Sequence, residues 1–166
     1  MHDELTSVDI KKMQDEIDER IQRRSKLREE MELARRDGDL SENFPYHSAK
    51  SELRKNQSRI DYLKKMIETA IVIDVESDND KIGLFDKVVL FYEMDQSERE
   101  IHIVTTLRQD AMRGYISKES AFGKALLGHK VGDRVAVTPR PDFTYYVVVR
   151  SIEKGVDDDT LEISPF

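Results

Sequence analysis

The sequence predicts an α+β protein, with an N-terminal antiparallel helical hairpin followed by a domain of one sheet with a helix lying on it. Two observations indicate this. As far as Ala70, apolar side chains recur every three or four positions, which is the spacing of helices that bury one stripe against each other. After Ile73 they gather in short β-branched and aromatic runs, which are typical of strands.

The first arm of the hairpin is expected between Val8 and Arg36, a helix about 43 Å long at about 1.5 Å per residue. Its seam positions are Ile10, Met13, Ile17, Leu27, Met31 and Ala34. The second arm continues the spacing at Tyr46, Ala49, Leu53, Ile60, Leu63, Ile67 and Ala70. Asn56 is the only polar residue of that second seam, so the pattern predicts two helices packed antiparallel.

Two basic residues, Arg20 and Arg24, also fall on seam positions of the first arm. Their long stems could cover the seam while the charged heads stay in solvent. Alternatively, they face Asn56 and fix the register of the two arms.

The turn between the arms is expected at residues 38–43, where the sequence reads Gly-Asp-Leu-Ser-Glu-Asn. Gly38 can take the left-handed conformation that ends a helix. The two residues Arg35 and Arg36 place positive charge where the dipole of the first helix favours it. These features predict that the first helix ends just before Gly38.

The second helix is expected to begin between Asn43 and Pro45, because proline fits the first turn of a helix, where its missing N–H costs nothing. Asn43 or Ser41 would then cap it. We expect Asp39 and Glu42 to lie in the turn, a few ångströms apart and facing outward. They are either ordinary turn residues, with Asp39 accepting a local hydrogen bond, or functional carboxylates carried at the end of a long hairpin.

Composition limits the classes of function. The 166 residues have a net charge of −7 and 37% charged residues, and an acidic chain is poorly suited to wrapping duplex DNA. There is no cysteine, which excludes disulfides, a thiolate nucleophile and a zinc ribbon. The four histidines have no metal-ligand spacing. We expect a cytoplasmic protein with no membrane segment, because no signal peptide or long apolar run is present.

The second half begins after an acidic connector at residues 74–81. Strands are expected at 88–92, 100–105, 134–138 and 145–149. A short helix is expected at 120–128, with Ser120 as its cap and Gly128 as its stop. The aromatic residues of this half are expected in the sheet core, namely Phe91, Tyr92, Phe143, Tyr145 and Tyr146. The predicted domains are therefore 1–76 and 77–166.

Two motifs resemble one known family. The turn sequence at 38–43 is followed by Tyr-His-Ser-Ala-Lys at 46–50, and the second half contains Ile-Ser at 116–117 and Ser-Ala-Phe-Gly-Lys-Ala-Leu-Leu-Gly-His-Lys at 120–130, then Val-Gly-Asp. In this order and at this separation, they resemble the tip and C-terminal signatures of the bacterial transcript cleavage factors of the GreA/GreB type, closer to GreA. The resemblance covers nearly the whole chain.

The resemblance implies a coiled-coil hairpin and an FKBP-like C-terminal domain in a monomer that is not itself an enzyme. The domain would dock on RNA polymerase at the rim of its secondary channel, through Ser120, Ala121 and Phe122. The hairpin would enter the channel and stimulate the polymerase to cleave the 3′ end of backtracked nascent RNA. By this resemblance Asp39 and Glu42 match the two tip carboxylates.

The implied cofactor is Mg²⁺ shared with the polymerase active site, and phosphodiester hydrolysis by two metal ions explains why carboxylates are needed. Mg²⁺ takes carboxylate oxygens and keeps several waters, so Asp39 could complete a weak second site while Glu42 acts on the attacking water. Two carboxylates alone are too few for tight binding by the free protein. Arg35, Arg36 and Lys50 are the cations best placed to attract the extruded RNA weakly. A solvated face is the expected role for Lys50, Arg54, Lys55 and Arg59 on the second arm.

The sequence departs from the family pattern in three places, one of which is Val8-Asp9-Ile10, where the first arm usually has Gly-Tyr. Phe44-Pro45 stands where the family commonly has Ala-Glu, and Ala121 stands where it usually has proline. Asp37 adds a third carboxylate near the tip. An alternative function is therefore a secondary-channel binder that inhibits or modulates polymerase without stimulating cleavage. Proline isomerisation, a further activity of FKBP-like folds, is not implied by fold alone.

Overall fold

A computed structural model describes residues 3–75, 78–158 and 160–165 of the chain. Its described residues form two compact units. One comprises Asp3 and Ile10–Ala70, and the other comprises Glu4–Asp9 and the residues from Ile71 onward. The first unit is helical, whereas the second contains the strands, so the predicted α+β class is confirmed.

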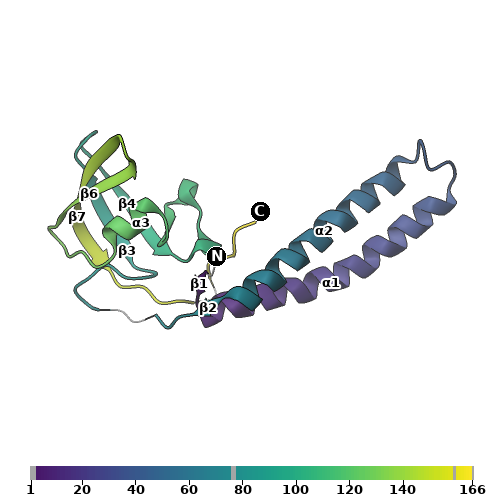
Figure 1. The fold of residues 1–166 in the computed structure, drawn as a ribbon, viewed down its shortest axis with the longest axis horizontal. Helices are drawn as coiled ribbons and strands as arrows, with labels where there is room; N and C mark the ends of the chain where they lie inside the picture. The colour runs from purple at the N-terminus through teal and green to yellow at the C-terminus, as the bar shows by residue number, and fades with distance from the viewer. Residues whose placement is uncertain (1–2, 76–77, 159, 166) are drawn as a thin grey trace. The chain divides into compact units, whose positions relative to one another are not determined.

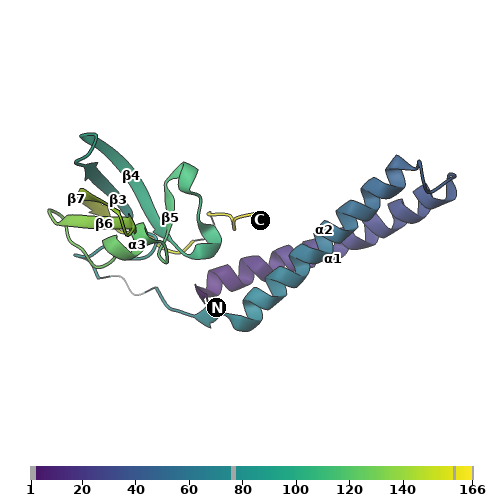
Figure 2. The ribbon, with the colours of Figure 1, turned by 45° about the horizontal axis from the view of Figure 1, so that its top comes forward.

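Two long helices form the hairpin, α1 (Ser7–Arg36) and α2 (Phe44–Thr69), which lie side by side and antiparallel in Figures 1 and 2. At about 1.5 Å per residue they are about 45 and 39 Å long. The predicted seam is buried at Met13, Ile17, Leu27, Ala34, Ala49, Ile60 and Leu63. Its other members are half-buried. The predicted helical hairpin is therefore confirmed.

Asn56 is the buried polar residue of the seam, and Arg20 contacts it. The Nδ2 of Asn56 donates to the backbone carbonyl of Arg20 at 2.9 Å, while Nη1 of Arg20 donates to Oδ1 of Asn56 at 3.4 Å. One turn further along α1, Nη1 of Arg24 donates to Oε1 of Gln57 at 3.0 Å. Arg20 thus faces Asn56, as the register interpretation expected, whereas Arg24 bonds Gln57 and not Asn56.

Arg59 corrects the expectation of a solvated face on the second arm. Its side chain is only 4% exposed and is paired with Glu16 of α1. The reason is geometric, because Arg59 directly precedes the buried Ile60 and its guanidinium finds a carboxylate on the facing helix. Lys50, Arg54 and Lys55 are exposed, as expected.

The second unit contains a five-stranded sheet in the order β5-β4-β3-β7-β6, seen with α3 beside it in Figure 2. The strands are β3 (Lys87–Tyr92), β4 (Ser97–Val104), β5 (Tyr115–Ser117), β6 (Arg134–Arg140) and β7 (Phe143–Glu153). Neighbours are antiparallel except β4 and β5, which are parallel. The four predicted strands are present and all four are longer than predicted, although β4 ends one residue earlier. The short β5 was missed, as were the 3₁₀ turns Thr106–Arg108 and Ala111–Arg113 that lead into it.

A short helix, α3 (Ala121–Leu126), covers one face of the sheet beside β6. Ser120 caps it, because its hydroxyl accepts from the amide of Gly123 at 2.9 Å. Gly128 follows the helix with φ +82°, the left-handed conformation expected of a stop residue. Both predicted end signals are confirmed. The core beneath the helix consists mainly of aliphatic strand residues together with Leu126 and Ile82.

The aromatic residues were predicted in the sheet core, and this is wrong for most of them. Only Tyr92 is buried, at 9% exposure, while Tyr146 is 38% exposed. Phe91 and Phe143 are half-buried, whereas the half-buried Tyr145 packs against the core and stacks on Tyr92. Side chains alternate across a strand, so Phe91 points away from its buried neighbours Leu90 and Tyr92. β-Branched and leucine side chains fill the core in their place.

The N-terminal residues Glu4–Asp9 belong to the second unit. The two-residue strands β1 (Glu4–Leu5) and β2 (Ile71–Val72) pair in parallel. This places the division between the units at Ala70 and Ile71, whereas the sequence placed the boundary between residues 76 and 77, which lie outside the described residues. No helix among the described residues is long and apolar enough to cross a membrane.

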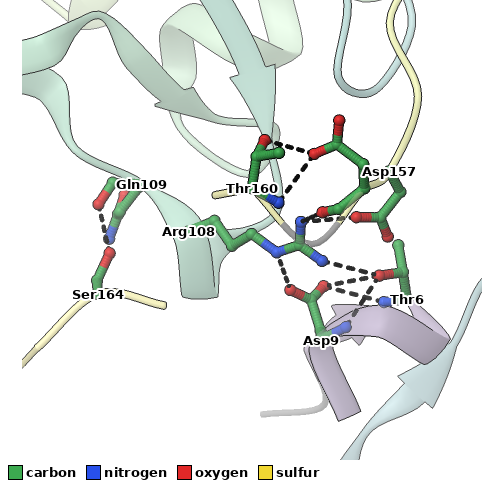
Figure 3. A network of polar contacts seen from close by, with 8 residues as sticks. Thr6, Asp9, Arg108, Gln109, Asp157, Thr160 and Ser164 are labelled. Carbon is green, nitrogen blue, oxygen red and sulfur yellow. Dashed lines mark hydrogen bonds and ion pairs between the residues drawn. The ribbon is translucent and has the colours of Figure 1, made fainter. Parts of the chain in front are cut away.

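A buried polar network in the second unit centres on Arg108, whose side chain has no exposed surface (Figure 3). Its Nε donates to Oδ1 of Asp9 at 2.7 Å, and its Nη1 lies 2.6 Å from Oδ1 of Asp157. Asp9 is itself held by Thr6, because the amide of Thr6 donates to Oδ2 of Asp9 at 3.0 Å and the amide of Asp9 donates to the Thr6 hydroxyl at 3.2 Å. This reciprocal pair is a capping box at the start of α1.

Candidate functional site at the hairpin tip

The turn at residues 37–43 is fastened to both helices by Asn43. Its Nδ2 donates to the carbonyl of Ala34 in the last turn of α1 at 2.5 Å. Its Oδ1 accepts from the amide of Tyr46 in the first turn of α2 at 3.0 Å. Asn43 is thus the N-cap predicted from the sequence, and it also donates to a carbonyl at the end of α1 that otherwise accepts, among the described residues, only from the amide of Asp37, at 3.3 Å. Pro45 lies in the first turn of α2, as expected.

Gly38 differs from its expectation. Its φ is +142°, which is positive but far from the left-handed helical value of about +57°. The residue therefore takes a conformation that favours glycine, although not the usual helix-ending one. No atom lies within 4 Å of the position that a Cβ would occupy, so the backbone conformation is what favours glycine here.

Asp39 lies in the turn and is exposed. Its Oδ1 accepts from the amide of Ser41 at 3.0 Å, which is the local bond that the turn-residue interpretation expected. The backbone hydrogen bond from Ser41 lowers the pKa of Asp39 below its ordinary value of 3.8. Asp39 is therefore both a turn-forming residue and an exposed anion at neutral pH.

Glu42 is also exposed, and the turn around it is held by its backbone. The carbonyl of Glu42 accepts from the amide of Phe44 at 3.0 Å. Leu40, which lies between Asp39 and Glu42 in the sequence, is held as well. Its carbonyl lies 2.6 Å from Nε2 of His47. The residues that bear the carboxylates are thus anchored on both sides, while both acidic side chains remain open to a partner.

The tip carboxylates suit a shared metal ion. Carboxylate oxygens are the ligands that Mg²⁺ prefers, and Mg²⁺ bound in this way keeps several waters. Among the described residues no group of three or more His, Cys, Asp or Glu could hold a metal ion. A metal role for Asp39 and Glu42 therefore stays a prediction.

The three cations singled out near the tip are all exposed. Nη1 of Arg35 lies 3.9 Å from Oε1 of Glu32, and Nζ of Lys50 lies 5.8 Å from the ring centre of Tyr46. Arg36 ends α1. None of these contacts buries the charge, so a weak attraction for RNA stays a prediction for all three.

The predicted docking residues lie at the start of α3. The hydroxyl of Ser120 is used within the protein, because it also donates to the carbonyl of Ser117 at 2.7 Å. Ala121 is exposed and Phe122 is half-buried. The ring of Phe122 lies 6.2 Å from that of Tyr92 and 6.3 Å from that of Tyr145. Ala121 is thus open to a partner, whereas the other two have structural roles as well.

Sequence reasoning missed two sets of positioning residues. The contact between His47 and Leu40 could not be predicted from the sequence. The two residues are seven positions apart across the turn, and only the conformation of the turn brings them together. The capping box of Thr6 and Asp9 does have one, the Ser/Thr-x-x-acid pattern before a helix. That pattern would have placed the start of α1 at Ser7 rather than Val8.

Comparison of the sequence with known families assigns this chain, with its helical hairpin and its mixed α+β unit, to the class of transcription elongation factors. The sequence profile described as "Transcription elongation factor, N-terminal" matches residues 4–72, and the one described as "Transcription elongation factor, GreA/GreB, C-term" matches residues 76–153. The chain belongs to the GreA/GreB family.

Individual relatives agree with this. The chain is 38% identical to transcription elongation factor GreA of Leuconostoc citreum, covering 90% of this chain and 95% of the relative. It is 37% identical to GreA of Oenococcus oeni, covering 83% and 86%. A crystal structure of GreA factor homolog 1 (Gfh1) of Thermus thermophilus has a TM-score of 0.44 at 22% identity, covering 93% of this chain and all of that one. Family membership rests on the sequence matches.

Proposed function

We propose that this protein binds bacterial RNA polymerase, inserts its hairpin into the secondary channel and stimulates the polymerase to cleave the 3′ end of backtracked RNA. The observation that carries the proposal is the tip geometry. Asp39 and Glu42 are both exposed on a turn that Asn43 fastens to the two helices. In a member of the GreA/GreB family, this arrangement delivers two carboxylates to another enzyme's active site.

The tip residues have distinct roles in the proposal. When bound, the second Mg²⁺ would supply activation of water and stabilisation of charge on the phosphate. Asp39 would hold that ion, and its lowered pKa keeps it ionised. Glu42 would orient the attacking water or take its proton. The chain activates chemistry that belongs to the polymerase and is not itself a hydrolase.

The second unit would carry the polymerase-docking surface. Ala121 at the start of α3 is exposed, and α3 is held in place by the core beneath Leu126. Ser120 would act mainly by capping α3, since its hydroxyl is engaged at both Gly123 and Ser117. Residues from about Lys81 onward are expected to supply most of the affinity.

A second candidate function, binding the channel without stimulating cleavage, is favoured by two tip features. Asp37 is a third exposed carboxylate next to the turn, and it could compete with Asp39 for the ion. Phe44 is 79% exposed where the family pattern has a small residue. In this case the protein would slow polymerase and release no RNA fragments.

The experiment adds the protein to stalled, backtracked polymerase and measures release of 3′ RNA fragments. Asp39→Asn keeps the hydrogen-bonding shape but removes the charge. A loss of about 3–4 kcal/mol of barrier stabilisation would slow cleavage by about two to three orders of magnitude. A higher Mg²⁺ concentration should restore part of the cleavage rate of Asp39→Asn by mass action. The second variant, Glu42→Gln, should also cleave more slowly, and Mg²⁺ should restore less of its rate.

The matched control is Glu29→Gln, which neutralises an exposed carboxylate of α1 away from the tip. It should behave like the parent. Polymerase affinity should change little in all three variants. Parental cleavage by Asp39→Asn, with binding confirmed, would remove the tip from the mechanism, and no fragment release by the parent would favour the second candidate.

A further inference from the structure

One side of the hairpin is hollowed next to the tip. The tip groove, as we name it, has a volume of about 360 Å³ and lies between α1 and α2. Its floor is formed by Leu27, Ala34 and Ala49, each buried to more than nine-tenths. Two of these three are alanines, so the seam is thin here and leaves room between the helices.

The end of the groove nearest the turn is bounded by Phe44 and Pro45. Phe44 is 79% exposed, and it is the only exposed phenylalanine among the residues described by the structure. Its position is fixed, because its amide bonds to the carbonyl of Glu42 and it begins α2 directly after the cap Asn43. A large exposed ring beside an apolar floor is a surface that gains free energy when a partner covers it.

The rim of the groove is acidic. Glu30 on α1 and Glu52 on α2 line it. Glu52 is partly neutralised by Arg23 at 3.6 Å and Lys55 at 3.5 Å, whereas Glu30 is exposed. From Glu30 to Glu52 the chain has six carboxylates and three Lys or Arg residues. This charge repels phosphate and favours a cationic occupant.

We infer that the tip groove receives an apolar side chain of an RNA polymerase polypeptide, flanked by Lys or Arg, when the hairpin is in the channel. The apolar group would rest on Ala34 and Ala49 against the Phe44 ring, and the cations would meet Glu30 and Glu52. This inference rests on the proposed function. It gives Phe44-Pro45, the departure from the family pattern, a binding role separate from that of the tip carboxylates.

A photo-crosslinking residue identifies the occupant directly. Phe44 is replaced by benzoylphenylalanine, which keeps an aromatic ring at the site, and the variant is irradiated in backtracked complexes that contain labelled RNA. We expect a crosslink to a polymerase polypeptide, in a peptide with Lys or Arg beside an apolar residue. Transfer of the RNA label would overturn the inference, because the occupant would then be a nucleic acid. The control is the same residue at Ser51, which is exposed on α2 and does not line the groove.

Two substitutions test the groove by function. Ser48→Trp fills it from an exposed position, and Glu30→Arg reverses the charge of its rim. Each should weaken polymerase binding by about fivefold to tenfold. For Glu30→Arg the loss should be larger at low salt than at high salt, because salt screens the reversed charge. The matched controls Ser51→Trp and Glu29→Arg, on exposed positions outside the groove, should bind like the parent. Helix content by circular dichroism should be equal in all four.

The outcomes separate this inference from the proposed function. If the parent stimulates cleavage and Ser48→Trp and Glu30→Arg match it in binding and rate, the groove has no occupant and the inference fails alone. If the parent neither binds polymerase nor stimulates cleavage, the proposed function fails and takes the inference with it. If the groove variants lose affinity while their controls do not, the inference stands.

Discussion

Arg59 of α2 holds both carboxylate oxygens of Glu16 across the hairpin. Its Nε donates to Oε1 at 2.9 Å and its Nη2 donates to Oε2 at 3.1 Å. Arg20 adds a third bond to Oε1 at 2.6 Å. Parallel bonds of this kind are stronger and more directional than a single ion contact, so the pair fixes one helix against the other next to the buried Ile17 and Ile60.

Replacing Glu16 by Gln should destabilise the hairpin by about 2–4 kcal/mol, because it removes the charge that accepts two hydrogen bonds from the buried Arg59 guanidinium. Urea unfolding followed by circular dichroism at the helix band measures this loss. Glu19→Gln, on an exposed position of the same helix, is the control and should change stability by less than about 0.5 kcal/mol. Equal midpoints for the two variants would mean that the ion pair contributes nothing.

The same pair predicts a pH dependence. Burial alone would raise the pKa of Glu16, but hydrogen bonds from Arg59 and Arg20 outweigh it and hold the pKa below its ordinary value of 4.5. The stabilisation is therefore present above the unfolded pKa and is lost as pH falls through the lower folded value. The free energy of unfolding should fall more steeply below pH 4.5 in the parent than in Glu16→Gln. Parallel pH curves would contradict the assignment.

Asn43→Ala should loosen the tip. It removes the cap on α2 and the donor to Ala34, and loss of such a cap costs about 1 kcal/mol, within a range of about 0.5–2. Hydrogen exchange at the Tyr46 amide should accelerate. Asn43→Asp keeps the oxygen that accepts from the Tyr46 amide but loses the donor to the Ala34 carbonyl. The Tyr46 amide should therefore stay protected from exchange, while cleavage stimulation should still be weaker. Unchanged exchange in Asn43→Ala would show that the cap is dispensable.

Regular periodicity made the hairpin and four strands predictable. The caps Asn43 and Ser120 were predictable because each side-chain oxygen accepts from an amide three residues ahead, and Gly128 was predictable because its backbone takes the left-handed conformation. The burial of Arg59 was not, because it depends on Glu16, 43 residues away. β1, β2 and β5 have two or three residues each, too few to show a period. At the tip, the exposed carboxylates follow from the turn sequence, whereas the groove depends on how two seams pack.

Gly123→Ala should destabilise the second unit. A Cβ at this position would lie 2.1 Å from the carbonyl oxygen of Ser117 and 2.9 Å from Cα of Lys118, so α3 would have to move off β5. We expect a loss of about 2–3 kcal/mol, seen as a lower thermal midpoint of the sheet unit. Gly83→Ala is the control, because its Cβ would meet only side-chain atoms at 3.6 and 3.7 Å. A parental midpoint for Gly123→Ala would show that the close packing of α3 is not required.

Arg108→Met tests whether the N-terminal residues are part of the second unit in solution. Arg108 compensates Asp9 and Asp157, and neither oxygen of Asp157 receives a hydrogen bond from the described residues. Methionine has a similar length but no charge, so two buried carboxylates would remain unpaired, at a cost of about 3–5 kcal/mol.

The expected result is a large drop in the unfolding midpoint of the second unit, with partial recovery when Asp157→Asn is added. Arg113→Met, which removes an exposed arginine five residues further on, should have little effect. A fragment that begins at Lys81 lacks Asp9 and β1, so for the same reason it should be less stable than the full chain. It should also compete for polymerase less well than the full chain, which keeps residues 4–9. If Arg108→Met and the Lys81 fragment both unfold like the parent, Asp9 does not stabilise this unit, and the network in Figure 3 has no energetic role.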